Sequence, residues 1–106
     1  YCWSGSWMDR VASLLGFAQR SGQLASGAEG VGAALRKGKA KCLIIAYDCS
    51  QNTLEKYTAM AARCRVPYYR YSSKVGLGQA IGKAPRSVLA VLDSGFARAI
   101  ASELDR

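Results

Sequence analysis

The sequence contains no histidine among its 106 residues. Histidine is the commonest general base and the commonest metal ligand in proteins, so its absence removes the usual carrier of both chemistries. The cysteines (Cys2, Cys42, Cys49 and Cys64) form no Cys-x-x-Cys pair, and the spacing from Cys42 to Cys49 is too wide for a zinc knuckle. The sequence therefore predicts no enzymatic activity, no cofactor and no metal site.

Long apolar runs are also missing. No stretch of 18 apolar residues exists, so no segment is expected to span a bilayer. Asp9 and Arg10 interrupt the N-terminal stretch, which lacks the pattern of a signal peptide. The cysteines are typical of reduced, mostly buried thiols rather than of a disulfide framework. We therefore expect a cytoplasmic protein without a membrane partner.

Acidic residues are scarce: seven Asp and Glu face fifteen Lys and Arg, giving a net charge of +8. Such an excess indicates a polyanionic partner, and nucleic acid is favoured over a membrane surface. The cations cluster along the chain at Arg36, Lys37, Lys39 and Lys41, at Arg70 and Lys74, and at Lys83 and Arg86. The tyrosines beside Arg70 (Tyr68, Tyr69 and Tyr71) are consistent with base stacking or, equally, with core packing.

Hydrophobic periodicity predicts alternating helices and strands. The continuously apolar stretch 42–47 is typical of a strand buried on both faces. Asn52 and Glu55 resemble a capping box, and Gly38 occupies a helix C-terminal position. The predicted helices cover about 8–19, 28–37, 52–65, 77–81 and 96–104, and the predicted strands cover 24–26, 42–47, 68–71 and 87–92. We therefore expect an α/β protein, a three-layer α/β/α sandwich with a mixed sheet of about four strands.

This fold is predicted to form one domain over residues 8–106, preceded by an N-terminal extension over residues 1–7. Two patterns inside it suggest catalysis but have simpler explanations. The glycines of 76–82 resemble a dinucleotide fingerprint with the third glycine one place too far along, and a tight turn with a short helix is favoured. Asp48 and Asp93 each follow a buried strand, where Asp commonly forms turns and caps.

Several motifs in order resemble those of bacterial YlxQ-type proteins, which belong to the kink-turn-binding ribosomal protein superfamily (the L-seven-Ae group). They are LGFAQRSGQL at 15–24, Ser-Gly at 26–27, GKAK at 38–41, AYDCS at 46–50, Asn-Thr at 52–53, Val-Pro at 66–67, LGQAIGK at 77–83 and GFA at 95–97. The resemblance covers nearly the whole chain from Met8 onward. It implies an α/β/α sandwich that binds structured RNA, ribosomal or containing a kink-turn, and functions within a ribonucleoprotein. DNA is not an expected partner.

In this family the start of the second helix and one further loop contact RNA. The resemblance carries these roles onto Gly27, Ala28, Glu29 and Gly30, and onto the loop at 71–75, with Tyr71, Ser72, Ser73 and Lys74. The clustered charge adds Lys37, Lys39 and Lys41 as phosphate ligands. The family's strong RNA binders carry Gly-x-Asn-Glu-x-x-Lys at the helix start, where this chain has Glu29, Gly30 and Ala33 in place of Asn, Glu and Lys.

Two alternatives to RNA binding remain open. One is a protein-interaction module that docks on the ribosome or on an RNA-processing complex and has lost kink-turn specificity; the substitutions at the helix start favour it. The other is a nucleotide-dependent enzyme, which rests only on the glycine pattern.

Overall fold

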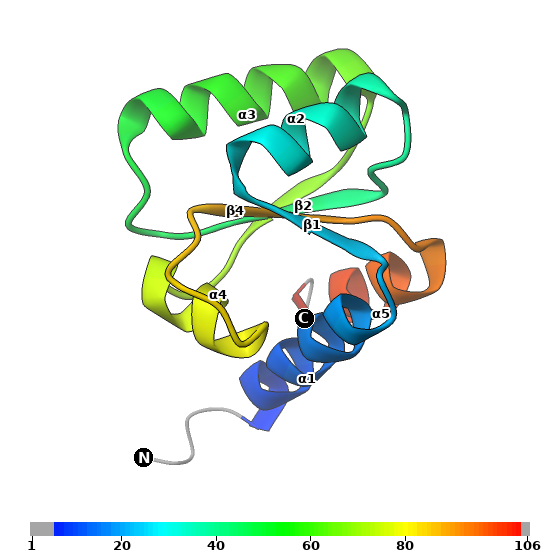
Figure 1. The fold of residues 1–106 in the computed structure, drawn as a ribbon, viewed down its shortest axis with the longest axis vertical. Coiled ribbons are helices and arrows are strands. Elements are labelled where there is room, and N and C mark those ends of the chain that lie inside the picture. The colour runs from blue at the N-terminus through cyan, green and yellow to red at the C-terminus, as the bar shows by residue number, and fades with distance from the viewer. Residues whose placement is uncertain (1–5, 105–106) are drawn as a thin grey trace.

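The computed structural model describes residues 6–104 (Figure 1). In chain order its elements are α1 (Ser6–Arg20), β1 (Leu24–Ser26), α2 (Gly27–Arg36), β2 (Cys42–Ile45), α3 (Gln51–Cys64), β3 (Tyr68–Arg70), α4 (Lys74–Ala80), β4 (Val88–Val91) and α5 (Ser94–Leu104). Helices and strands alternate, as predicted.

The four strands form one mixed sheet in the order β1-β4-β2-β3. β4 is antiparallel to both β1 and β2, whereas β3 is parallel to β2. Helices α2 and α3 cover one face, and α1, α4 and α5 cover the other (Figure 1). The mixed sheet and the three-layer sandwich are therefore confirmed.

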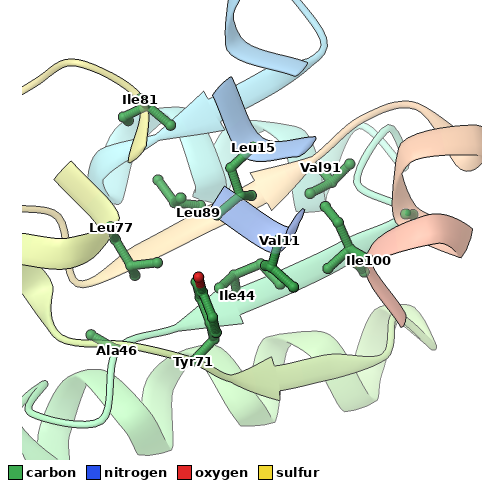
Figure 2. Packing of buried hydrophobic residues seen from close by; sticks show 12 residues of the cluster. Val11, Leu15, Ile44, Ala46, Tyr71, Leu77, Ile81, Leu89, Val91 and Ile100 are labelled. Carbon is green, nitrogen blue, oxygen red and sulfur yellow. The ribbon is translucent and has the colours of Figure 1, made fainter. Parts of the chain in front are cut away.

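The two central strands are apolar throughout because both of their faces are buried. Side chains alternate between the faces. Leu43 and Ile45 pack with α2 and α3, whereas Ile44 packs with α1, α4 and α5. Figure 2 shows this second cluster, in which Val11, Leu15, Leu77 and Ile100 converge on the sheet around Ile44 and Leu89.

Helix starts differ from the predicted positions because serines cap them. Helix α3 begins after Ser50, whose Oγ accepts a hydrogen bond from the Thr53 amide at 3.1 Å, so the predicted Asn52 cap is wrong. Helix α4 begins at Lys74, three residues earlier than predicted, because the Ser73 hydroxyl accepts from the Gly76 amide at 3.1 Å. The segment 71–75 is thus a loop only as far as Ser73.

Other boundaries move by a few residues. Helix α1 starts at Ser6, inside the predicted extension 1–7, whose first five residues lie outside the described part. Strand β2 ends at Ile45, and Tyr47 beyond it is 63% exposed rather than buried. The glycine pattern lies in α4 and in the turn at Gly82, whose φ of 70° suits glycine. The short-helix explanation of these glycines is therefore confirmed.

Within residues 6–104, no helix is long and apolar enough to cross a bilayer. The same residues contain no group of three or more potential ligands placed to hold a metal ion. Cys42 is buried, Cys49 is half-buried and Cys64 is exposed, and all three are free thiols. Cys2 lies outside the described residues.

Candidate nucleic-acid interface

Four segments meet at one edge of the sheet because of the strand directions. In the register, Ile45 lies opposite both Val88 and Arg70, and Ser26 lies opposite Leu89. The ends of β1, β2 and β3 therefore lie beside the start of β4. We call this side the helix-start edge; it comprises residues 26–30, 46–50, 71–74 and 84–87. Figure 1 shows the starts of α2 and α3 above it on the left.

Gly27 makes the bend that starts α2 at this edge. Its φ is +81°, a conformation that favours glycine, and Ser26 before it is extended. The Ser26 side chain makes no capping hydrogen bond to the helix. A helix start carries backbone N–H donors and partial positive charge, so this one is suited to an anionic or hydrogen-bond-accepting ligand.

A cavity of about 430 Å³ opens beside this bend. It lies between the start of α2, the first turns of α3 and the loop before β4. Two cations, Lys56 and Arg86, contribute to its wall. The remaining lining residues are Ser26, Gly27, Thr53, Tyr57, Pro85, Ser87 and Val88. The cavity thus combines a helix start, positive charge and room for one nucleotide-sized group.

Backbone and side-chain contacts fix Arg86. Its amide donates to the Lys74 carbonyl at 3.1 Å, which joins this loop to the start of α4. Its guanidinium donates to the carbonyls of Ala84 and Pro85 at 3.1 and 3.2 Å. On the opposite wall, burial raises the pKa of the Tyr57 phenol, which therefore stays neutral, and the Lys56 ammonium lies 5.4 Å from its ring centre. The cavity charge accordingly comes from Lys56 and Arg86.

Asp48 ties the loops of this edge together. Asp48 lies in the turn that follows β2, as predicted, and its carboxylate also accepts from the Lys74 amide at 2.9 Å. The neighbouring Tyr47 amide donates to the Ser72 carbonyl at 2.8 Å, and the Arg70 guanidinium donates to the Tyr47 carbonyl at 2.8 Å. Ser72 itself has a φ of 61°, a strained conformation for a residue other than glycine. These bonds hold the loop in a fixed shape before any ligand binds.

Comparison with known proteins places this architecture. The profile of the Ribosomal protein L7Ae/L30e/S12e/Gadd45 family matches residues 9–101. The chain belongs to this family. It is 40% identical over 92 residues to the RNA-binding protein YlxQ of Bacillus subtilis (strain 168), covering 87% of this chain and 92% of that protein.

Members and structures from other sources agree. The large ribosomal subunit protein eL30B of Schizosaccharomyces pombe is 38% identical over 91 residues, covering 82% of this chain and 76% of its own length. A solved structure of a protein with unknown function from Bacillus halodurans C superposes with a TM-score of 0.87 at 34% identity. It covers 92% of this chain, which in turn covers 98% of it. The family resemblance seen in the sequence is therefore confirmed over nearly the whole domain.

The structure brings together only part of the set that the L7Ae-family pattern predicted. Gly27, Glu29 and Gly30 lie on the helix-start edge, and so do Ser72, Ser73 and Lys74, as do the backbone atoms of Ala28. Tyr71 is only 5% exposed, and its ring belongs to the core shown in Figure 2. It therefore supports the loop from below, and its ring is not available to stack on a base.

Lys37, Lys39 and Lys41 lie elsewhere. They follow the C-terminal end of α2, and the Lys41 amide donates to the carbonyl of Val91 at the far end of β4. Helix α2 has ten residues and is therefore about 15 Å long, so these lysines lie at the opposite ends of the strands from Gly27. They cannot neutralise phosphates of the same nucleotides that contact the helix-start edge.

The sequence prediction did not assign Lys56, Arg86 or Tyr47 to the site, although Arg86 belongs to one of the charge clusters seen along the chain. Lys56 and Arg86 are thirty positions apart and meet only because α3 and the loop before β4 flank the same helix start. Tyr47 was placed in a buried strand but is exposed at the edge, with the Arg70 guanidinium 5.7 Å from its ring centre. No spacing in the sequence signals these neighbours.

Proposed function

We propose that this protein binds structured RNA at the helix-start edge and performs no covalent chemistry. The observation that carries the proposal is the cavity where the Gly27 bend, Lys56 and Arg86 converge. Phosphate oxygens accept hydrogen bonds from helix-start amides and are attracted to the two cations, and a neighbouring unpaired nucleotide fits the open cavity. The name of the Bacillus subtilis relative, RNA-binding protein YlxQ, supports this proposal.

The RNA that this edge favours is bent or bulged. A continuous duplex keeps its bases stacked, so nothing would enter the cavity, whereas a bulge offers an unpaired base with its phosphate. The fixed loop at 71–73 and the Arg86 loop then hold the backbone on either side. A kink-turn satisfies this requirement, and ribosomal RNA contains bends and bulges of the same kind; the name of the eL30B relative supports a ribosomal context.

Glu29 sets a limit on base selection at this edge. Its carboxylate is exposed in the first turn of α2 and accepts hydrogen bonds but donates none. The asparagine found there in strong kink-turn binders has both a donor and an acceptor. Losing one base contact costs about 1–3 kcal/mol by analogy with protein–DNA complexes. We therefore propose recognition of RNA shape, with weaker discrimination between kink-turn sequences.

Binding of a fluorescent bulged RNA, measured by anisotropy from about 50 to 200 mM salt, tests the proposal. Lys56→Gln with Arg86→Gln should lower the slope of log affinity against log salt by about 0.7–0.9 for each lost phosphate contact. Arg10→Gln with Arg20→Gln is the matched control, because those exposed cations lie on α1. An unchanged slope in the cavity variant, or equal affinity for bulged and fully paired RNA, would contradict it.

A second candidate function is protein docking on the ribosome or on an RNA-processing complex. The observation in its favour is Phe17, which is 51% exposed on α1 with the Arg20 guanidinium 4.9 Å from its ring centre. An exposed aromatic ring beside an arginine is a common anchor at protein interfaces. If Phe17→Ala abolishes copurification of one protein while RNA affinity is unchanged, docking is the function; if RNA affinity is the property lost in the cavity variant, RNA binding is.

A further inference from the structure

The edge of the sheet opposite Gly27 carries a dense group of exposed cations, which we call the lysine edge. Two contacts assemble it. The Cys64 thiol lies 3.5 Å from the Leu35 carbonyl, so the C-terminal ends of α3 and α2 are adjacent. Lys41 and Arg98 line one cavity of about 290 Å³ between β2 and α5. The cations of this edge are Arg36, Lys37, Lys39, Lys41, Arg63, Arg65 and Arg98, and all of them are exposed.

Among the side chains that the structure describes, no carboxylate forms an ion pair with these cations. The described ion pair joins Arg10 to Glu103 at 3.3 Å, on α1 and α5. Asp93 lies at the end of β4, but its carboxylate accepts from the Phe96 amide at 2.9 Å and caps α5. The positive charge of the lysine edge is therefore not neutralised by the described part of the chain.

The fold itself requires little of this charge. A helix C-terminus carries about half a negative charge, so the adjacent ends of α2 and α3 together carry about one. Arg36 and Arg63, each in a last turn, already exceed that amount. Lys39 and Lys41 lie beyond the helix, and Arg98 lies within α5 away from its end. The excess is several-fold, and it opposes folding through self-repulsion unless a polyanion binds.

Arg65 is a cation of the lysine edge at a position whose backbone conformation favours glycine. It follows α3 with a φ of 58° and a ψ of 42°, the left-handed conformation that favours glycine at a helix end. An arginine is strained at this position, and it adds one more cation to an edge where the helix ends are already balanced. The local structure alone would be better served by glycine.

We propose that the lysine edge binds the phosphate backbone of a second RNA segment, so that one protein molecule joins two segments. The helix-start edge and the lysine edge lie at opposite ends of the strands and face away from each other (Figure 1). One straight helix therefore cannot contact both. Recognition at the lysine edge depends on charge and suits the regular backbone of a duplex. The joining of two segments rests on the proposed function, whereas duplex binding by the lysine edge does not.

Tethered protein provides the test. The protein is held through an N-terminal tag, saturated with a bulged RNA, and then exposed to a labelled, fully paired RNA duplex. We expect wild type to capture the duplex without releasing the bulged RNA. Lys39→Gln with Lys41→Gln should keep the bulged RNA but lose duplex capture, whereas Lys56→Gln with Arg86→Gln should lose the preference for bulged over fully paired RNA and keep the duplex. In direct titration, the lysine-edge variant should lower the salt slope for the duplex by about 0.7–0.9 for each contact.

Arg65→Gly makes the test independent of folding. It removes a cation while relieving the left-handed strain, so its melting temperature should equal or exceed that of wild type. We expect weaker duplex capture from this equally stable protein. Wild type that binds bulged RNA but captures no duplex, or lysine-edge variants with an unchanged duplex slope, would overturn the inference and leave the proposed function intact. Failure of wild type to bind bulged RNA would overturn the proposed function alone. Duplex binding by the lysine edge would then still be tested by the direct duplex titration.

Discussion

Gly78→Ala should destabilise the protein although alanine is the better helix former. Gly78 lies in α4, and its carbonyl accepts hydrogen bonds from the amides of Ile81 and Lys83 as the chain folds back over it. A Cβ atom at this position would lie 2.5 Å from the Ala84 carbonyl oxygen and 2.8 Å from the Lys83 carbonyl oxygen. Both obstacles are backbone atoms, so the loop that leads to Arg86 must move.

The expected loss follows from two opposing terms. Overpacking against fixed atoms costs about 1–3 kcal/mol. Replacing a helical glycine by alanine returns up to about 1 kcal/mol. After the full gain is subtracted, a net loss of up to about 2 kcal/mol remains, which lowers the melting temperature of a domain of this size by up to roughly 16 °C. Because the displaced loop carries Pro85 and Arg86 into the cavity wall, affinity for bulged RNA should fall as well.

Calorimetry or circular dichroism melting measures the change, and Gly30→Ala is its matched control. A Cβ atom at Gly30 would meet only the Ala25 Cβ, at an ordinary 3.6 Å. Gly30→Ala should therefore stabilise α2 by up to about 1 kcal/mol. The two substitutions are chemically identical but opposite in sign. A Gly78→Ala protein that melts at or above the wild-type temperature would refute the close-packing argument.

Two further predictions concern the thiols and a helix cap. Burial raises the pKa of the Cys42 thiol to about 12. At pH 8 a thiol reagent should therefore modify the exposed Cys64 in the native protein and Cys42 only after denaturation, which peptide mass spectrometry measures. Rapid labelling of Cys42 in the native protein would contradict its burial. Ser50→Ala should lower the free energy of unfolding by about 0.5–2 kcal/mol because it removes the α3 cap, whereas Asn52→Ala should have almost no effect. Urea denaturation measures both changes, and the reverse order would support the Asn52 cap predicted from the sequence.

The sandwich was predictable because its signals are local. Strands buried on both faces must be apolar at every position, which is the pattern at Cys42–Ile45 and Val88–Val91. The caps were less predictable, because Ser50 and Asn52 are both good capping residues and the sequence does not rank them. The backbone decides: Ser50 is extended, whereas Asn52 already lies inside the helix.

The candidate interface was only half predictable, since it depends on the order of strands. Gly27 could be expected at a helix start from the sequence alone, but its neighbours depend on β4 inserting between β1 and β2. That insertion carries the Arg86 loop to the helix start and leaves the lysines of 37–41 at the opposite edge. The clusters of cations along the chain predicted a polyanionic partner. The fold places those cations on two separate surfaces.

In the binding mode that we propose, the division of contacts at the helix-start edge accounts for RNA binding with little selection between bases. Glu29 is the acidic side chain in the first turn of α2, and as an acceptor alone it cannot satisfy base groups that need a donor. The other groups that we propose as RNA contacts are backbone amides, Lys56 and Arg86, and these suit phosphate. Phosphate contacts position an RNA without identifying its bases. On this proposal the remaining selectivity comes from shape: an RNA that bends sharply enough to place one unpaired nucleotide beside Gly27 brings its backbone within reach of both cations.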